Sequence, residues 1–145
     1  MKVYLAGPFF NESERNSIEK AKTILLKKDL SLFVPMEHKI EDAYSLPNDV
    51  WSRLVFEMDR DAIYDCEVMV CIYSGLYGDT GTAWEIGFAK AMGKKIVVVH
   101  TEYNDFTSLM INNSADYNLQ GIDSLEKFDF EHFDKNNSNV NNEQK

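Results

Sequence analysis

Cysteine and positive charge are both scarce in this chain of 145 residues. Its 15 Lys and Arg residues are outnumbered by 24 Asp and Glu residues, which gives a net charge of −9. No basic cluster stands out, so we do not expect a nucleic-acid polymer as a partner. The two cysteines, Cys66 and Cys71, flank or enter an apolar segment. We therefore expect buried, reduced thiols and a cytoplasmic location.

Long hydrophobic runs and metal-site spacings are also missing. No apolar segment reaches the roughly 20 residues of a membrane-spanning helix, so we expect no membrane partner. The three histidines are scattered and no Cys/His cluster has zinc spacing, so no metal site is predicted. The motifs of P-loop NTPases, of G-x-G-x-x-G dinucleotide enzymes and of G-x-S-x-G hydrolases are absent, which argues against these three classes.

Short apolar runs instead alternate with amphipathic segments. Strands are predicted at 3–6, 32–34, 68–73 and 96–99, the third of which is typical of a strand buried on both faces. Helices are predicted at 12–28, 49–64 and 82–92, with weaker signals at 106–111 and 124–133. This alternation predicts an α/β fold with a parallel sheet flanked by helices.

The domain organisation follows from the same pattern. Residues 1–135 are predicted to form a single domain, and 136–145, half of which are Asn, a disordered polar tail. Ligands of parallel α/β sheets bind beyond the carboxyl ends of the strands. Unusual segments at 6–9, 35–38 and 78–85 follow the first three predicted strands. We expect the functional site where these segments converge.

Glu85 has a structural and a functional interpretation. It lies in the first turn of the predicted helix 82–92, and its spacing from Thr82 is that of a capping box. The functional interpretation uses the same position. A helix N-terminus keeps a carboxylate ionised, and an ionised carboxylate over a crevice is a competent nucleophile toward a sugar carbon. The local pattern leaves both interpretations open.

The other candidates are similarly ambiguous. Asp79 lies in a Gly-Asp-Thr-Gly segment, which is typical of a turn, or accepts a hydrogen bond from a ligand. Asp59 lies near the end of the predicted helix 49–64, either on a solvated face or in the site. Gly7 and Pro8 either end the first strand or let the backbone approach a ligand closely. Tyr4 and Phe9 either pack in the core or contact a ligand.

Segment 79–89, which reads Asp-Thr-Gly-Thr-Ala-Trp-Glu-Ile-Gly-Phe-Ala, is similar to the D-x-G-T-A-x-E-x-G-x-A signature of the nucleoside 2-deoxyribosyltransferase family. Segment 4–8 resembles the family's opening strand and glycine turn, and segment 59–63 resembles its acidic helix end. The resemblance covers roughly residues 2–99. It implies a single-domain Rossmann- or flavodoxin-like fold and base exchange on 2′-deoxynucleosides. The exchange runs through a covalent deoxyribosyl-glutamate intermediate with retention, and it requires no cofactor.

The resemblance also implies roles for individual residues. Glu85 matches the nucleophile, Asp59 an aspartate that helps to protonate the leaving base, and Tyr4 a tyrosine that orients the nucleophile. Asp79 matches an aspartate that holds the 5′-hydroxyl, and His38 falls where family members contact the base. The remaining substrate-binding positions are Gly7, Pro8, Phe9, Gly81 and Thr82. The implied partners are deoxynucleosides, free nucleobases and further copies of the chain in a homo-oligomer.

Two other functions are compatible with these residues. An N-glycosidase of the same superfamily would hydrolyse (deoxy)nucleoside 5′-monophosphates, but such hydrolases tend to carry serine where this chain has Asp79. An ionised aspartate repels a phosphate, which favours an unphosphorylated nucleoside. A non-catalytic nucleotide-sensing module would need the pocket but not Glu85.

Overall fold

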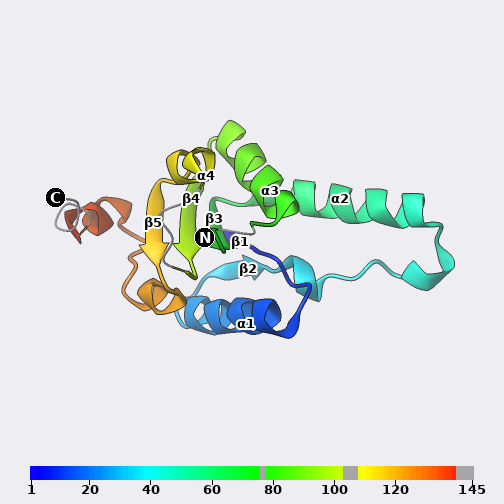
Figure 1. Ribbon diagram of the computed structural model, residues 1–145, viewed down its shortest axis with the longest axis horizontal. Coiled ribbons are helices and arrows are strands. Elements are labelled where there is room, and N and C mark those ends of the chain that lie inside the picture. The colour runs from blue at the N-terminus through cyan, green and yellow to red at the C-terminus, as the bar shows by residue number, and fades with distance from the viewer. Residues whose placement is uncertain (76–77, 103–107, 140–145) are drawn as a thin grey trace.

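A five-stranded parallel sheet forms the centre of the molecule in the computed structural model, which describes residues 1–75, 78–102 and 108–139 (Figure 1). The strands are β1 (Lys2–Ala6), β2 (Ser31–Phe33), β3 (Val68–Tyr73), β4 (Lys95–His100) and β5 (Tyr117–Gln120). Their order is β2-β1-β3-β4-β5, and every neighbouring pair is parallel. This is the flavodoxin-like order, in which the winding reverses between β1 and β3, and it confirms the predicted fold class.

Helices cover both faces of the sheet. The helical elements are α1 (Glu12–Leu26), α2 (Asn48–Asp65), α3 (Thr80–Ala91), α4 (Leu109–Ser114) and the 3₁₀ segments η1 (Pro35–Glu37), η2 (Ala43–Ser45), η3 (Ile122–Glu126) and η4 (Phe133–Asn139). In Figure 1, α1 and η3 lie on one face, and α2, α3 and α4 lie on the other. The site must therefore lie at an edge of the sheet that these helices leave open.

Strand β1 shows how the alternation of side chains positions the site. Val3 and Leu5 belong to the core shared with α1, whereas Tyr4 and Ala6 belong to the core shared with α2 and α3. A strand sends successive side chains to opposite faces, so this division follows from the register alone. Tyr4 is thereby placed on the same face as the carboxylates of α2 and α3.

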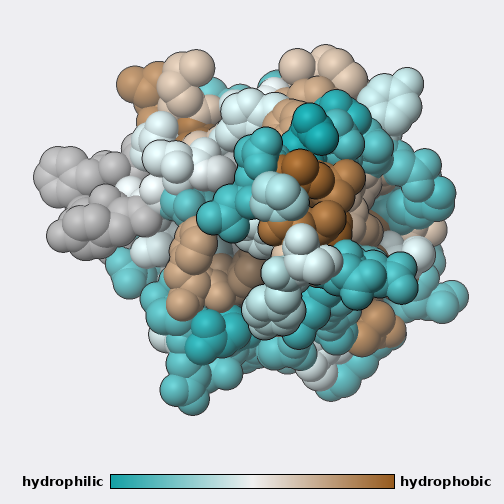
Figure 2. All heavy atoms as spheres, turned by 90° about the vertical axis from the view of Figure 1, so that its right-hand side faces the viewer, coloured by the Kyte–Doolittle hydropathy of each residue, from teal (hydrophilic) through white to brown (hydrophobic). Residues whose placement is uncertain are grey.

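Helix α2 projects beyond the sheet (Figure 1). Ile63, in its last turn, is the one α2 residue that is buried, while Trp51 and Phe56 are 42% and 44% exposed. Hydrophobic side chains gather near the centre of the face on this side of the molecule, surrounded by hydrophilic ones (Figure 2). Within the described residues, no helix is both long and apolar enough to cross a membrane.

The C-terminal third departs from the sequence predictions. The helix predicted at 124–133 is wrong: η3 ends at Glu126, and Phe128 and Phe130 are both buried with ring centroids 4.7 Å apart. Residues two apart cannot face the same way on a helix, so joint burial requires an irregular backbone. Strand β5 was not predicted, because it has only two apolar residues in alternation, Tyr117 and Leu119.

The two weakest predictions fall partly outside the described residues. The helix predicted at 106–111 begins at Leu109, and 106–107 are not described. The predicted tail begins with residues 136–139 of η4, where the Asn136 side chain bonds the backbone N–H and C=O of Asp129. Residues 140–145 are not described, so the domain boundary at 135 stays a prediction.

Candidate active site

The candidate site lies where β1 and β3 end, at the point where the winding of the sheet reverses. Gly7 follows β1 with φ of 153°, which side chains rarely adopt. A Cβ at Gly7 would lie 2.8 Å from Cδ1 of Ile18 and 3.1 Å from the carbonyl oxygen of Ile72. Gly7 therefore allows β1 to end tightly between α1 and β3, which is a packing reason for the glycine.

Three polar side chains from β1, α2 and α3 meet beneath this edge. Tyr4 is fully buried, and Asp59 and Glu85 are half-buried. The Tyr4 hydroxyl interacts with the Glu85 carboxyl, but too loosely for a well-formed hydrogen bond. The Tyr4 hydroxyl, Oδ1 of Asp59 and Oε2 of Glu85 are buried atoms with no hydrogen-bond partner among the described residues. Such atoms are rare in folded proteins, and a cluster of three indicates a functional site.

The two carboxyl groups are held in an environment that disfavours their charge. Burial raises the pKa of Glu85 to about 7; the Tyr4 hydroxyl opposes this rise, and the charges of Asp59 and Asp79 add to it. Burial also raises the pKa of Asp59 to about 6, with His38 opposing the rise. The expectation that the helix N-terminus keeps Glu85 ionised stays a prediction, and the burial of the carboxyl acts against it.

The start of α3 also corrects the capping-box interpretation. The helix begins at Thr80 rather than Thr82, and Asp79 is its N-cap. Oδ2 of Asp79 accepts hydrogen bonds from the Thr82 amide at 2.8 Å and from the Thr82 hydroxyl at 2.9 Å. The Thr82 amide is thus already satisfied, and Glu85 lies in the second turn, free of any capping role.

Thr82 is 1% exposed, and both of its donors are directed to Asp79. The prediction that Thr82 contacts substrate is not tested here, but in this structure both Thr82 donors are used by Asp79. Gly81 is exposed beside the same carboxylate: a Cβ at Gly81 would lie 3.1 Å from Oδ2 of Asp79. Thr82 thus holds the Asp79 carboxylate, and Gly81 leaves room for it.

A stack of three rings extends from the carboxylate cluster. The rings of Tyr4 and Phe33 lie 5.5 Å apart, and those of Phe33 and His38 lie 4.1 Å apart at an angle of 6°. This stack brings the exposed His38 close enough to Asp59 to affect its pKa. Phe33 was missed in the sequence, where the only signal is an aromatic residue at the end of the strand beside β1. Phe9 lies apart from this stack, paired with Phe10 at 6.2 Å.

A cavity of about 320 Å³ opens at the same sheet edge. Its lining includes Pro8 and Asp79, as predicted, together with Tyr73, which was not. Glu14 and Glu102 add two more carboxylates, and no Lys or Arg is present among the described residues that line it. Asp79 connects the cavity with the cluster, since its charge also acts on Glu85.

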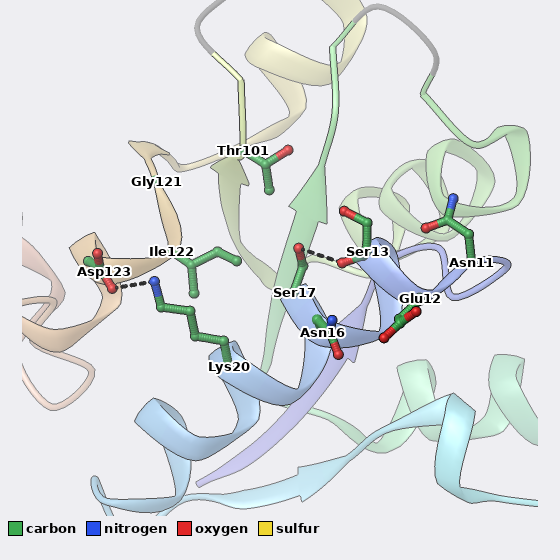
Figure 3. Close-up of a pocket in the computed structure, with 10 residues that line it drawn as sticks. All are labelled: Asn11, Glu12, Ser13, Asn16, Ser17, Lys20, Thr101, Gly121, Ile122 and Asp123. Atoms are coloured by element: carbon green, nitrogen blue, oxygen red, sulfur yellow. Dashed lines mark hydrogen bonds and ion pairs between the residues drawn. The ribbon is translucent and has the colours of Figure 1, made fainter.

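A wider trough of about 980 Å³ adjoins this cavity along α1 (Figure 3). The two share Asn11, Ser13, Ser17 and Thr101. At its far end, Lys20 pairs with Asp123 at 2.8 Å. The cavity and the trough thus form a continuous opening along this edge of the sheet, with Asp79 in the lining of the cavity.

The model of the nucleoside 2-deoxyribosyltransferase family matches residues 3–142 of the chain. The chain belongs to this family. Among solved structures, it is similar to a 2-deoxyribosyltransferase from Bacillus psychrosaccharolyticus, with 30% identity and a TM-score of 0.81 over 90% of this chain and 93% of that one. A comparison with curated proteins gives no significant match.

Two more distant structures share the fold. One is BcmB, a CMP N-glycosidase from Clostridium botulinum, with 22% identity and a TM-score of 0.62 over 88% of this chain and 97% of that one. The other is a 2-deoxyribosyltransferase from Leishmania mexicana, with 20% identity and a TM-score of 0.59 over 80% of this chain and 88% of that one. At this identity the likeness concerns the fold alone.

In this nucleoside 2-deoxyribosyltransferase-family chain, the predicted site residues thus divide into groups. Tyr4, Asp59 and Glu85 form the buried cluster, with His38 joined to it through Phe33. Pro8 and Asp79 line the cavity. Within the part of the chain that the structure describes, no group of three or more His, Cys, Asp or Glu side chains could hold a metal ion.

Proposed function

We propose that this chain exchanges the base of 2′-deoxynucleosides through a covalent deoxyribosyl-Glu85 intermediate. The observation that carries the proposal is the Glu85 carboxyl, whose Oε2 is buried without a partner between Tyr4 and Asp59. Unpartnered carboxyl atoms at the switch point of a parallel sheet are typical of a site that a substrate completes. Membership of the nucleoside 2-deoxyribosyltransferase family supports the same assignment.

The chemistry needs two displacements at C1′ of the sugar. In the first, an ionised Glu85 oxygen bonds to C1′ while the bond from C1′ to the base breaks, and Asp59 gives its proton to the leaving base. In the second, a nitrogen of another base attacks C1′, the ester to Glu85 breaks, and Asp59 takes back the proton. Two inversions retain the β-configuration, as in retaining glycosidases. Without a 2′-hydroxyl the oxocarbenium-like transition state is more accessible, so we propose no cofactor.

The raised pKa values leave one proton on the pair, and in the free protein Glu85, which has the higher pKa, holds it. The reaction needs one ionised carboxylate and one protonated carboxylic acid. Two carboxyl groups with pKa values of about 6 and about 7 share a single proton between these pH values. We propose that this singly protonated pair is the active form, with substrate binding directing the proton to Asp59.

The cavity at Asp79 supports an uncharged 5′ end. Oδ2 of Asp79 is engaged by Thr82, whereas Oδ1 has no partner among the described residues and remains to accept a hydrogen bond from a 5′-hydroxyl. Glu14 and Glu102 surround the same cavity. A 5′-phosphate would bring about two negative charges to this place, so we propose nucleosides rather than nucleotides as substrates.

The alternative is hydrolysis of (deoxy)nucleoside 5′-monophosphates. The fold shared with a CMP N-glycosidase is the observation that favours it. Three carboxylates around the cavity oppose it, because they repel the phosphate. A non-catalytic nucleotide-sensing module is a weaker candidate, because it leaves the buried carboxyl pair without a role.

We also propose that the chain acts as a homo-oligomer in the cytoplasm. The projecting α2 and the hydrophobic side chains on its side of the molecule offer a surface for a second copy (Figures 1 and 2). Both cysteines are free and buried, which suits a reducing compartment.

Replacement of the nucleophile tests the proposed function. With 2′-deoxyinosine as donor and free adenine as acceptor, Glu85→Gln should lower the rate of 2′-deoxyadenosine formation by at least about a thousandfold. The fold should survive, because Glu85 does not cap α3. Exposed Glu41 provides the matched control, and Glu41→Gln should leave the rate unchanged. A folded, active Glu85→Gln protein would contradict the proposal.

A further inference from the structure

The carboxylate of Asp79 has two separate tasks in the proposed function. It caps α3, and it is expected to hold the 5′-hydroxyl of the substrate. Its two oxygens are unequal: Oδ2 accepts two hydrogen bonds from Thr82, and Oδ1 accepts none from the described residues. One oxygen is therefore fixed to the protein, while the other is free of protein partners among the described residues, and the residue itself lines the cavity.

The second hydrogen bond exceeds what the helix cap requires. An N-cap side chain satisfies its role with one backbone N–H, here the Thr82 amide at 2.8 Å. The Thr82 hydroxyl adds a bond of 2.9 Å to the same oxygen, from a side chain that is 1% exposed. Two hydrogen bonds to one oxygen restrict rotation of the carboxylate more than a single hydrogen bond would.

Gly81 leaves the space that the same carboxylate occupies. A Cβ at Gly81 would lie 3.1 Å from Oδ2 of Asp79, which is tighter than nearly all real Cβ contacts. The backbone at Gly81 does not have the positive φ found at Gly7, Gly93 and Gly121. The need for glycine at this position therefore arises from the room that Asp79 occupies.

We infer that Gly81 and Thr82 are positioning residues that fix the Asp79 carboxylate with Oδ1 toward the 5′ end of the substrate, and that they thereby set the preference for a 5′-hydroxyl. This inference rests on the proposed function and deepens it. It replaces the predicted direct contact of both residues with substrate. A nucleoside without a hydroxyl on its 5′ carbon cannot donate a hydrogen bond to Oδ1 of Asp79, so fixing this oxygen does not improve its binding.

The test compares two substrates in matched variants. The substrates are 2′-deoxyadenosine and 2′,5′-dideoxyadenosine, which lacks only the 5′-hydroxyl, each with free hypoxanthine as acceptor. Thr82→Val keeps the side-chain shape and removes the hydroxyl donor, whereas Thr82→Ser restores it. In Thr82→Val, the ratio of kcat/KM for the two substrates should fall about tenfold, mainly through KM for 2′-deoxyadenosine. Thr82→Ser should keep the ratio, and Gly81→Ala should lower it.

Equal losses of kcat/KM on both substrates in Thr82→Val would show a merely structural role and overturn the inference. An unchanged ratio in both Thr82→Val and Gly81→Ala would overturn it as well. Circular dichroism confirms that each variant is folded.

A binding measurement separates this inference from the proposed function. Dissociation constants of the two nucleosides are measured by calorimetry for Glu85→Gln with and without Thr82→Val, so that no turnover is needed. The ratio of the constants should change about tenfold in the same sense. If the unmodified chain transfers no base but these constants follow the expected pattern, the proposed reaction is wrong and the positioning role stands. If neither nucleoside binds, both are contradicted.

Discussion

In the proposed function, catalysis and stability make opposite demands on Glu85. Burial raises its pKa to about 7 from the ordinary 4.5, so the folded protein binds this proton more tightly than the unfolded chain does. The stability contributed by the group is fully present below about pH 4.5 and is lost as the pH rises through about 7. Above neutral pH, Glu85 carries a negative charge in a buried environment that disfavours it.

We therefore predict that Glu85→Gln stabilises the fold at pH 8. Glutamine has the same shape and no charge, and the free energy of unfolding should rise on the order of 1–3 kcal/mol. Toward pH 4 the gain should disappear, because Glu85 is then protonated in both states. Urea unfolding at the two pH values, with Glu41→Gln as the exposed control, measures the difference. A gain of equal size at both pH values would contradict the raised pKa.

Asp59 provides a second prediction at this scale. If the proposed mechanism holds, the raised pKa values of Asp59 and Glu85 predict a bell-shaped pH profile of kcat/KM, with limbs near pH 6 and pH 7. Asp59→Asn removes the proton donor and a neighbouring negative charge, so the pKa of Glu85 should fall. In Asp59→Asn we expect the maximum of kcat/KM to fall about 100- to 10,000-fold. The alkaline limb of its pH profile should disappear, and the acidic limb should shift to lower pH. A profile of unchanged shape in Asp59→Asn would remove Asp59 from the mechanism.

Asp79 caps α3, and the selective role that we propose for it can be tested separately from the cap. Asp79→Ser keeps a good N-cap residue, so α3 should remain intact. At roughly 4 Å and an effective dielectric constant near 20, each pair of unit charges costs on the order of 4 kcal/mol before screening. Removal of the carboxylate should therefore raise the ratio of kcat/KM for 2′-deoxyadenosine 5′-monophosphate over 2′-deoxyadenosine at least about tenfold. Steady-state kinetics with both donors tests this, and an unchanged ratio would return Asp79 to a purely capping role.

At the scale of elements, the fold could be predicted from the sequence wherever the pattern is local. The apolar run of β3 and the helical spacing of α1 each indicate their structure without help from the rest of the chain. The start of α3 could not be predicted in this way, because Asp79 and Thr82 are both good capping residues. The structure decides between them: the Thr82 backbone amide donates to the Asp79 carboxylate, which makes Asp79 the cap.

The properties of the site were even less accessible from local pattern. The signature around Glu85 and Asp79 singled out these residues as candidates, but it did not indicate the raised pKa of Glu85. That pKa depends on burial, on Tyr4 from β1 and on Asp59 from α2, which only the folded sheet brings together. Strand β5 and the segment with Phe128 and Phe130 were missed for a related reason, since long-range packing determines their backbone.

At the scale of the whole molecule, a single chain does not explain why the projecting α2 exposes hydrophobic side chains. Trp51 is 42% exposed near the start of this helix, where it would be covered by a second copy in the proposed homo-oligomer. We predict that light scattering reports a mass above that of the 16.7 kDa chain at assay concentration. Trp51→Glu should reduce that mass, whereas Ser52→Glu, which adds the same charge at an exposed neighbouring position, should not. A fully active monomer would contradict the homo-oligomer.

The transfer of a sugar from one base to another is the central claim, and one product analysis tests it most directly. The chain is incubated with 2′-deoxyinosine and an excess of free adenine, and the products are separated by chromatography. We predict 2′-deoxyadenosine and hypoxanthine in equal amounts, with no metal or cofactor added. Free deoxyribose with no new nucleoside, even at high adenine concentration, would contradict base exchange and favour a hydrolase.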